Sequence, residues 1–176
     1  MTRDEYEKIA GSLIGKTIAG TRYYEIDYGN GEFHFFDDPR FDSLDHGLEI
    51  ELSTGGHFSI TWGAEFEQYG ISLNSDALST ILSGGRSLDV SHTPRWKPIV
   101  GRTVRSVDVF WSWCQESGRP ETRVYYPQDL LLEFEGKKPI VISALEIREG
   151  DRFVGMIDHI TVFDDIETAK RFKCLT

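Results

Sequence analysis

The segment FHFFDDPRFDSLDHG, residues 33–47, carries four Asp, two His and four Phe in fifteen positions. Its carboxylates and imidazoles, from His34 to His46, are groups that divalent metal ions accept as ligands. The same groups could serve as a general acid and a general base in a hydrolase. Their spacing does not match an EF-hand loop, in which acids alternate and one glycine is fixed. A metal-binding protein or a hydrolase is therefore one hypothesis for this segment.

The net charge of the chain is concentrated around this segment. The whole sequence has a formal charge of −10, and residues 25–51 hold nine acidic residues and one basic residue, which leaves −8 in that stretch. Such a field attracts basic partners and repels nucleic acid and anionic lipid. We therefore expect a basic protein partner, with nucleic acid unlikely and no membrane.

A recognition loop is the second hypothesis for the acidic segment. Exposed carboxylates would steer a basic partner and bond to its Lys and Arg, and aromatic rings within the acidic rim would anchor it. The residues that we expect to bind this partner are Glu32, Phe36, Asp37, Asp38, Phe41, Asp42 and Asp45. A solvated acidic loop whose Phe residues pack into the core is the alternative.

Two other motifs resemble catalytic or nucleotide-binding sites only in part. GSLIGKT, residues 11–17, has three residues between its glycines where a P-loop needs four, and a helix is expected before it. Ser87, Asp89 and His92 lie close together in RSLDVSHT, whereas a catalytic triad is assembled from distant segments. We therefore expect no enzyme activity and no cofactor.

Trp111 and Trp113 alternate with Ser112 in a predicted strand and would share one of its faces. Core packing explains such a pair, because aromatic side chains bury large areas. A platform on which single-stranded nucleic acid stacks is the alternative, but it needs a basic groove.

The chain contains an internal repeat. Residues 14–26 (IGKTIAGTRYYEI) are similar to 100–112 (VGRTVRSVDVFWS), 50–61 to 132–143, and 69–76 to 159–166. Each copy predicts a strand, a hairpin of alternating apolar and polar residues, a further strand and a helix. When the first strands of the two copies are aligned, their apolar faces do not coincide. Tyr24 and Ile26 lie on one face of the strand, and Val107 and Val109 align with the opposite face. We expect a β-bulge in one of the two copies to reconcile them.

These elements predict an α+β fold, mainly an antiparallel sheet, in one compact body of residues 1–176. It is built from two pseudo-symmetric strand–hairpin–strand–helix repeats, about residues 15–83 and 101–173, joined by a linker at 84–98 that is rich in Gly, Pro and Ser. Residues 3–15 predict an additional N-terminal helix, and residues 74–83 predict the helix of the first repeat.

Residues 96–170 resemble immunity proteins of bacterial polymorphic and contact-dependent toxin systems. The resemblance rests on Trp96, VGRTV at 100–104, Trp113, YPQDLLLEFEGKKPIVISALEI at 126–147 and DHITVFDD at 158–165. It implies a cytoplasmic protein that is not an enzyme and that neutralises one cognate toxin domain by occlusion. The strands-then-helix unit is also similar in outline to Whirly-type folds, which implies single-stranded nucleic-acid binding as an alternative.

The N-terminus and the cysteines agree with a cytoplasmic location. The first fifteen residues are acidic and amphipathic, unlike a signal peptide, and Cys114 and Cys174 form no paired motif. No pattern in the sequence predicts an oligomeric state.

Overall fold

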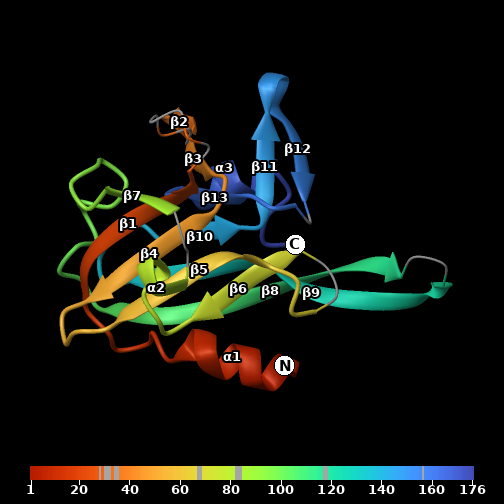
Figure 1. The fold of residues 1–176 in the computed structure, drawn as a ribbon, viewed down its shortest axis with the longest axis horizontal. Helices are drawn as coiled ribbons and strands as arrows, with labels where there is room; N and C mark the ends of the chain where they lie inside the picture. Colours follow the sequence, from red (N-terminus) through yellow and green to blue (C-terminus); the bar gives the residue numbers. More distant parts are fainter. Residues whose placement is uncertain are drawn as a thin grey trace.

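The computed structural model describes residues 1–27, 29, 33, 36–66, 69–81, 85–116, 119–155 and 157–176. Within these ranges the protein is mainly antiparallel β-structure with three short helices (Figure 1). None of the helices in the described ranges has the length and apolar character needed to cross a membrane.

The strands form a five-stranded sheet, a six-stranded sheet and a separate two-stranded hairpin. The first sheet has the order β6-β5-β4-β1-β7 and consists of β1 (Ile18–Ile26), β4 (Gly47–Leu52), β5 (His57–Gly63), β6 (Gly70–Asn74) and β7 (Gly85–Asp89). The second has the order β2-β3-β13-β10-β9-β8 and consists of β2 (Phe36–Asp38), β3 (Phe41–Leu44), β8 (Val104–Glu116), β9 (Arg119–Phe134), β10 (Ile140–Ser143) and β13 (Ile160–Phe163). The separate hairpin pairs β11 (Leu145–Arg148) with β12 (Arg152–Gly155) across a 3-10 turn at Glu149–Asp151.

The helices are α1 (Arg3–Gly11), α2 (Leu78–Ile81) and α3 (Ile166–Arg171). The predicted N-terminal helix is confirmed, and Thr2 and Glu5 begin it with a capping box that satisfies two free backbone N–H groups. The helix predicted at 74–83 begins later than expected, at Leu78, and is described as far as Ile81, because residues 82–84 lie outside the described ranges.

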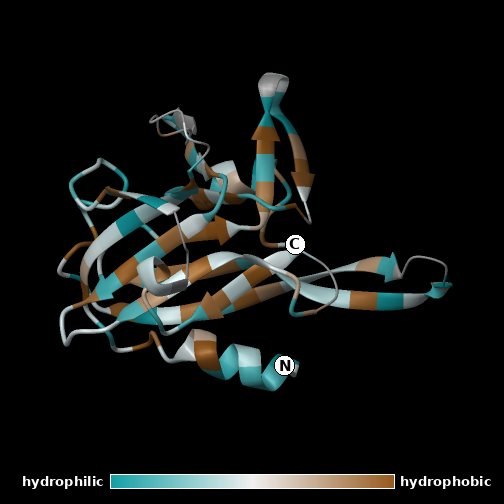
Figure 2. Ribbon diagram, viewed as in Figure 1, coloured by the Kyte–Doolittle hydropathy of each residue, from teal (hydrophilic) through white to brown (hydrophobic). Residues whose placement is uncertain are grey.

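Both sheets contribute side chains to one hydrophobic core. Its fully buried members include Ile18 and Tyr23 from β1, Ile60 from β5, Leu132 from β9 and Val162 from β13. In Figure 2 hydrophobic positions recur along the facing strands, with polar positions between them. The strands predicted from the period-2 patterns are therefore present, although β3, β10 and β13 are buried on both faces.

Four strands of each sheet follow one another in chain order. The first sheet runs β1, β4, β5, β6 across its width, and the second runs β8, β9, β10, β13. The predicted hairpins are β4–β5 and the inner part of β9 with β10. The β2–β3 hairpin leaves the first half of the chain and pairs through β3 with β13, at the edge of the second sheet.

The two halves of the chain meet at their first strands. Gly15 donates its N–H to the carbonyl of Val104 (2.9 Å), and Gly101 donates its N–H to the carbonyl of Ile18 (2.8 Å). Both glycines have a positive φ, 79° and 78°, which L residues with a side chain rarely adopt. GKT at 15–17 is therefore the entry to a strand.

The β-bulge expected in one copy does not explain the difference in parity, because a register shift is found at corresponding positions in the first strands of both halves. The register shifts between Ile18 and Gly20 in β1, and between Val104 and Ser106 in β8. The difference in parity arose from taking the Tyr24 face of β1 as the one toward the core, whereas Tyr23 is the residue in that core.

The segment 84–98 was predicted as a linker, but residues 85–98 form a strand followed by turns that pack against the rest of the protein. It includes β7, which pairs with β1, and it places Trp96 in the hydrophobic core with no exposed area. The segment therefore helps to hold the two sheets together.

Candidate partner-binding site

The acidic segment folds into the β2–β3 hairpin, and Asp38 organises its turn. The Asp38 carboxylate accepts hydrogen bonds from the Arg40 backbone N–H (2.8 Å), from Arg40 Nε (2.9 Å) and from an Arg40 terminal nitrogen (3.0 Å). These bonds hold the pKa of Asp38 below its usual range, because they favour the charged carboxylate. Asp38 is thus engaged within its own hairpin.

The guanidinium of Arg40 also reaches the neighbouring β11–β12 hairpin. It donates to both carboxylate oxygens of Asp151, at 2.8 and 3.0 Å, and so lowers the pKa of Asp151. Carboxylates from two hairpins therefore hold one guanidinium between them in a bidentate arrangement.

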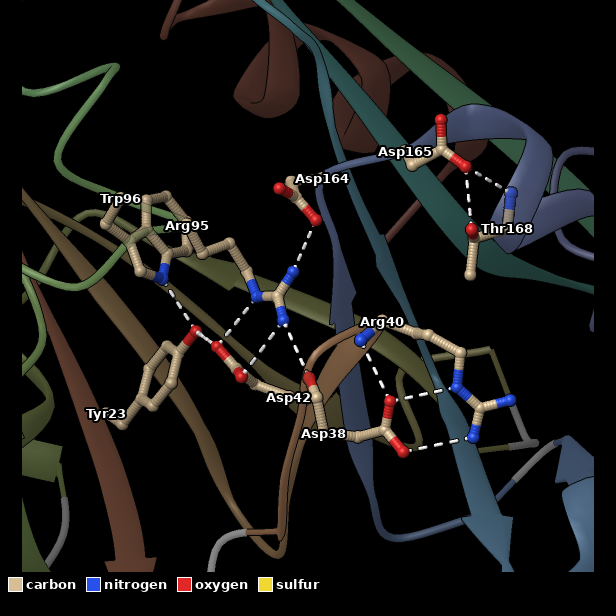
Figure 3. A network of polar contacts seen from close by, with 9 residues as sticks. All are labelled: Tyr23, Asp38, Arg40, Asp42, Arg95, Trp96, Asp164, Asp165 and Thr168. Atoms are coloured by element: carbon tan, nitrogen blue, oxygen red, sulfur yellow. Dashed lines mark hydrogen bonds and ion pairs between the residues drawn. The ribbon is translucent and has the colours of Figure 1, made fainter.

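Asp42, four residues after Asp38, faces the interior and pairs with Arg95. Arg95 Nε lies 2.9 Å from one Asp42 oxygen, and both side chains are almost fully buried, 7% and 8% exposed (Figure 3). Tyr23 donates its O–H to the same oxygen at 2.5 Å, and Trp96 Nε1 donates to the Tyr23 hydroxyl at 2.6 Å. Burial raises the pKa of the Tyr23 phenol well above its ordinary value, so this group stays neutral.

Arg95 has two further acceptors besides Asp42. One terminal nitrogen bonds to Asp164 at 2.5 Å and the other to the Asp38 carbonyl at 3.2 Å (Figure 3). The next residue, Asp165, caps α3 by accepting from the N–H and the hydroxyl of Thr168, at 2.8 and 2.6 Å. The cap fixes the start of α3 and so places Asp164 against Arg95.

The residues predicted to bind a partner do not form one exposed surface. Phe41 is 1% exposed and packs with Phe163 and Phe172 in a second hydrophobic cluster, so this aromatic anchor is a core residue. Asp42 is 6% exposed and is likewise an interior residue.

The remaining residues predicted to bind a partner are Asp38, Asp45, Phe36, Asp37 and Glu32. Asp38 and Asp45 are half-buried, and Asp45 accepts from the Ile26 N–H at 3.3 Å. Phe36 and Asp37 lie on β2, where the structure describes only their backbone, and Glu32 lies outside the described residues.

Much of the acidic charge in residues 25–51 is engaged by the protein itself. Glu25 and Glu49 are 1% and 2% exposed, and Glu49 accepts from the Leu78 N–H at 2.6 Å. Glu51 pairs with Arg22 at 2.9 Å on the half-exposed surface of the first sheet. The sequence count of −8 therefore overstates the charge that a partner would meet at this surface.

A groove of about 430 Å³ lies between the β2–β3 and β11–β12 hairpins. Figure 1 shows the two hairpins rising on the same side of the molecule. The charged and titratable side chains of the groove are Asp38, Arg40, Glu146, Arg148, Asp151 and His159. In this groove the half-buried carboxylate of Asp38, from the acidic segment, comes close to the exposed carboxylate of Asp151, from the second half of the chain.

Comparisons of the chain with protein-family models, with curated proteins and with solved structures return no match. The candidate site therefore stands on its own geometry and on the sequence.

The described residues do not provide a set of ligands for the metal site that was considered at His34–His46. Among them no three His, Cys, Asp or Glu side chains are grouped to hold a metal ion, and His34 lies outside the described ranges. His46 packs edge-on against Trp62 with ring centroids 5.8 Å apart, and burial lowers its pKa.

The remaining sequence motifs are found in ordinary structural positions. Asp89 on β7 accepts from the Ser91 N–H at 2.9 Å, which is a local turn contact. Trp111 packs against Tyr6 and Phe66 and donates to Glu7 at 3.0 Å, whereas Trp113 is 46% exposed. The two tryptophans therefore do not form one exposed platform.

Sequence reasoning missed Arg95 and Asp151, which determine how the acidic residues are used. A partial signal for Arg95 was present, because a carboxylate that becomes buried needs a base, but the sequence does not indicate which of its 19 bases that is. Asp151 had no such signal, since its proximity to Arg40 depends on how two distant hairpins are placed.

Proposed function

We propose that this chain is a bacterial immunity protein that acts in the cytoplasm. It binds a cognate, basic toxin domain and neutralises that domain by occluding its active site, without catalysis of its own. The resemblance of residues 96–170 to immunity proteins supports this proposal. We place the toxin-binding surface at the groove between the β2–β3 and β11–β12 hairpins.

The arrangement of Arg40 between Asp38 and Asp151 is the observation that carries the proposal. Two carboxylates on separate hairpins are spaced to bond one guanidinium at 2.8–3.0 Å. The Arg40 and Asp151 side chains are 42% and 59% exposed, so an arginine of the toxin can take the place of Arg40. Bidentate pairing of this kind selects arginine by geometry as well as by charge.

The net charge of the chain supports a basic partner. A formal charge of −10 raises the rate at which a positively charged domain encounters this surface, most strongly at low salt. Many toxin domains of such systems are basic nucleases, which makes a nuclease domain a suitable partner for these carboxylates.

The test is a binding titration with the toxin domain that is encoded beside this chain. The double variant Asp38→Asn and Asp151→Asn should slow association by about tenfold at low salt and weaken the salt dependence of the rate. Asp42 is left intact in this variant because it is buried against Arg95.

The matched control removes two charges far from the groove. One lies on β8, at the opposite edge of the second sheet, and the other lies in the turn after β9. Asp108→Asn with Glu135→Gln changes the net charge equally, and both side chains are exposed. Equal slowing in both variants would show that only the overall charge matters, and no binding by the wild type would disprove the proposal.

We also infer that the two halves of the chain are pseudo-symmetric repeats. The shared strand order, the bulges at corresponding positions and the reciprocal bonds of Gly15 and Gly101 support this inference. The β2–β3 hairpin, inserted between β1 and β4, is then an addition to the first repeat, because β8 leads directly into β9. Additions of this kind on a rigid sheet are common places for recognition.

A further inference from the structure

The β8–β9 hairpin carries the core-facing surface of the second sheet beyond the end of the core. Val107, Val109 and Trp111 lie on one face of β8 and pack against the main hydrophobic core. Trp113 continues that face, because side chains two residues apart point the same way. In Figure 1 the outer part of the hairpin extends away from the body, with no strand of the first sheet drawn over it.

The uncovered part of this face holds an aromatic pair and an arginine. Trp113 and Tyr125 are direct cross-strand partners and are 46% and 48% exposed. The Arg123 guanidinium lies over the Trp113 ring, 4.1 Å from its centroid. Trp, Tyr and Arg are the residues that most often carry the binding energy of a protein interface.

We infer that this face of the hairpin, residues Trp113, Glu121, Arg123 and Tyr125, is a contact surface for a second copy of the same chain. Exposure alternates along this part of β9, with Glu121, Arg123 and Tyr125 exposed and Thr122 and Val124 half-buried. Arg123 therefore lies on the same side as the aromatic pair, and Glu121 is exposed beside it, where the register shifts between Gln115 and Glu116.

Charge complementarity points to a second copy as the occupant. Residues 111–127 contain two acidic and two basic residues, so the hairpin is neutral in a chain of charge −10. Two copies repel each other least where they meet through this neutral surface. If the two hairpins cross antiparallel about a twofold axis, Glu121 of each copy faces Arg123 of the other, which makes the contact self-complementary.

The acid of this pair is available for such a contact. Glu121 makes no ion pair with any residue that the structure describes, and Arg123 is held by Trp113 rather than by a carboxylate. Each Arg123 can therefore bond to Glu121 of the other copy while it stays stacked on its own Trp113.

The test measures the mass of the full chain in solution across a concentration series by sedimentation velocity and light scattering. We expect the 20.1 kDa chain to dimerise reversibly. Trp113→Ala with Tyr125→Ala should raise the dissociation constant by at least about 30-fold, the effect of losing one strong contact residue. Phe153→Ala, at a 37% exposed aromatic on β12, should leave the dimer unchanged.

Variants with reversed charge distinguish the loss of an interface from the loss of the fold, because a misfolded chain would not recover dimerisation on mixing. Arg123→Glu makes the exposed charges of the surface all negative, and Glu121→Arg makes them all positive, so each variant alone should be monomeric. Mixing the two should restore a dimer that contains one chain of each kind.

Three results would overturn the inference. They are a wild-type chain that stays monomeric at the highest concentration, a dimer that these variants do not weaken, and two charge variants that do not associate when mixed. Quenching of Trp113 fluorescence by single-stranded oligonucleotides without dimerisation would also overturn it, in favour of a nucleic-acid surface.

Discussion

The β2–β3 hairpin and the outer β8–β9 hairpin use their side chains in opposite ways. Around the first, acidic residues are dense, and the carboxylates of Asp38 and Asp42 are bonded within the protein. The second has no net charge over residues 111–127 and leaves the rings of Trp113 and Tyr125 in solvent. A dense cluster of reactive residue types therefore does not by itself predict a free binding surface.

The cost of burying charge explains this difference. A carboxylate removed from water needs a counter-charge and hydrogen bonds, so Asp42 is held by Arg95 and Tyr23. An exposed aromatic ring has no such requirement, and Trp113 can stay uncovered where the core ends.

The largest expected effect is at Arg95, where the acidic segment meets the interior. Arg95→Met should lower the free energy of unfolding by about 3–5 kcal/mol, because the Asp42 carboxylate is then buried without its base. Urea unfolding measures this loss. The double variant with Asp42→Asn should recover part of it, and a loss below about 1 kcal/mol would show that the acidic segment does not depend on Arg95.

The second prediction concerns Asp129, an acid on β9 at the base of the long hairpin. Burial raises its pKa to about 6 from 3.8, although Ser143 and the Leu175 N–H bond to its carboxylate. Between these two pKa values the folded protein binds more protons than the unfolded chain. The unfolding free energy should therefore fall by about 3 kcal/mol as the pH rises through this window.

Asp129→Asn tests this pH dependence directly. An amide does not titrate, so the variant should lose this part of the slope while it keeps a hydrogen-bond acceptor at the same place. Urea unfolding at a series of pH values on both sides of 6 gives the comparison. Equal slopes for wild type and variant would contradict the assignment to Asp129.

The third prediction separates Arg40 from Arg95. Arg40→Ala should cost at most about 1 kcal/mol of unfolding free energy, because the Arg40 guanidinium that pairs with Asp38 and Asp151 is 42% exposed to solvent. The cost should shrink further in high salt, as measured by urea unfolding at two ionic strengths. A loss as large as that of Arg95→Met would mean that the groove is a structural element of the fold.

The smallest expected effect on stability is at Trp113. Trp113→Ala should change the unfolding free energy by less than about 0.5 kcal/mol at concentrations where the chain is monomeric. Trp96→Ala is the matched control, and it should cost about 3–5 kcal/mol because Trp96 is fully buried. A large loss at Trp113 would show that the hairpin face is part of the core of a single chain.

Local patterns in the sequence predicted most of the elements. The alternation in residues 50–61 and 132–143 indicated the hairpins β4–β5 and β9–β10, and both are present. The helix expected at the end of the second copy is α3, which begins after the Asp165 cap. These predictions succeeded because turn chemistry, side-chain alternation and helix capping act over a few residues.

Features that depend on distant contacts were not predictable from a single sequence. The strand pairing of β3 with β13 joins residues about 120 positions apart, as in the contact between Ser43 and Thr161. That pairing buries Phe41 against α3 and its flanking residues and so removes it from the predicted surface. The same limitation applies to Asp42, whose burial depends on a base 53 residues later.

The crossing of Gly15 and Gly101 has a consequence for synthesis of the chain. Thr17 and Thr103, 86 residues apart, pair side by side at this point, and the backbone of Ile18 bonds to that of Arg102. The start of β1 therefore cannot complete its bonds until residue 104 has left the ribosome. Closing so long a loop is slow compared with forming the β4–β5 hairpin. During translation the start of β1 therefore lacks these bonds until residues 101–104 have been made.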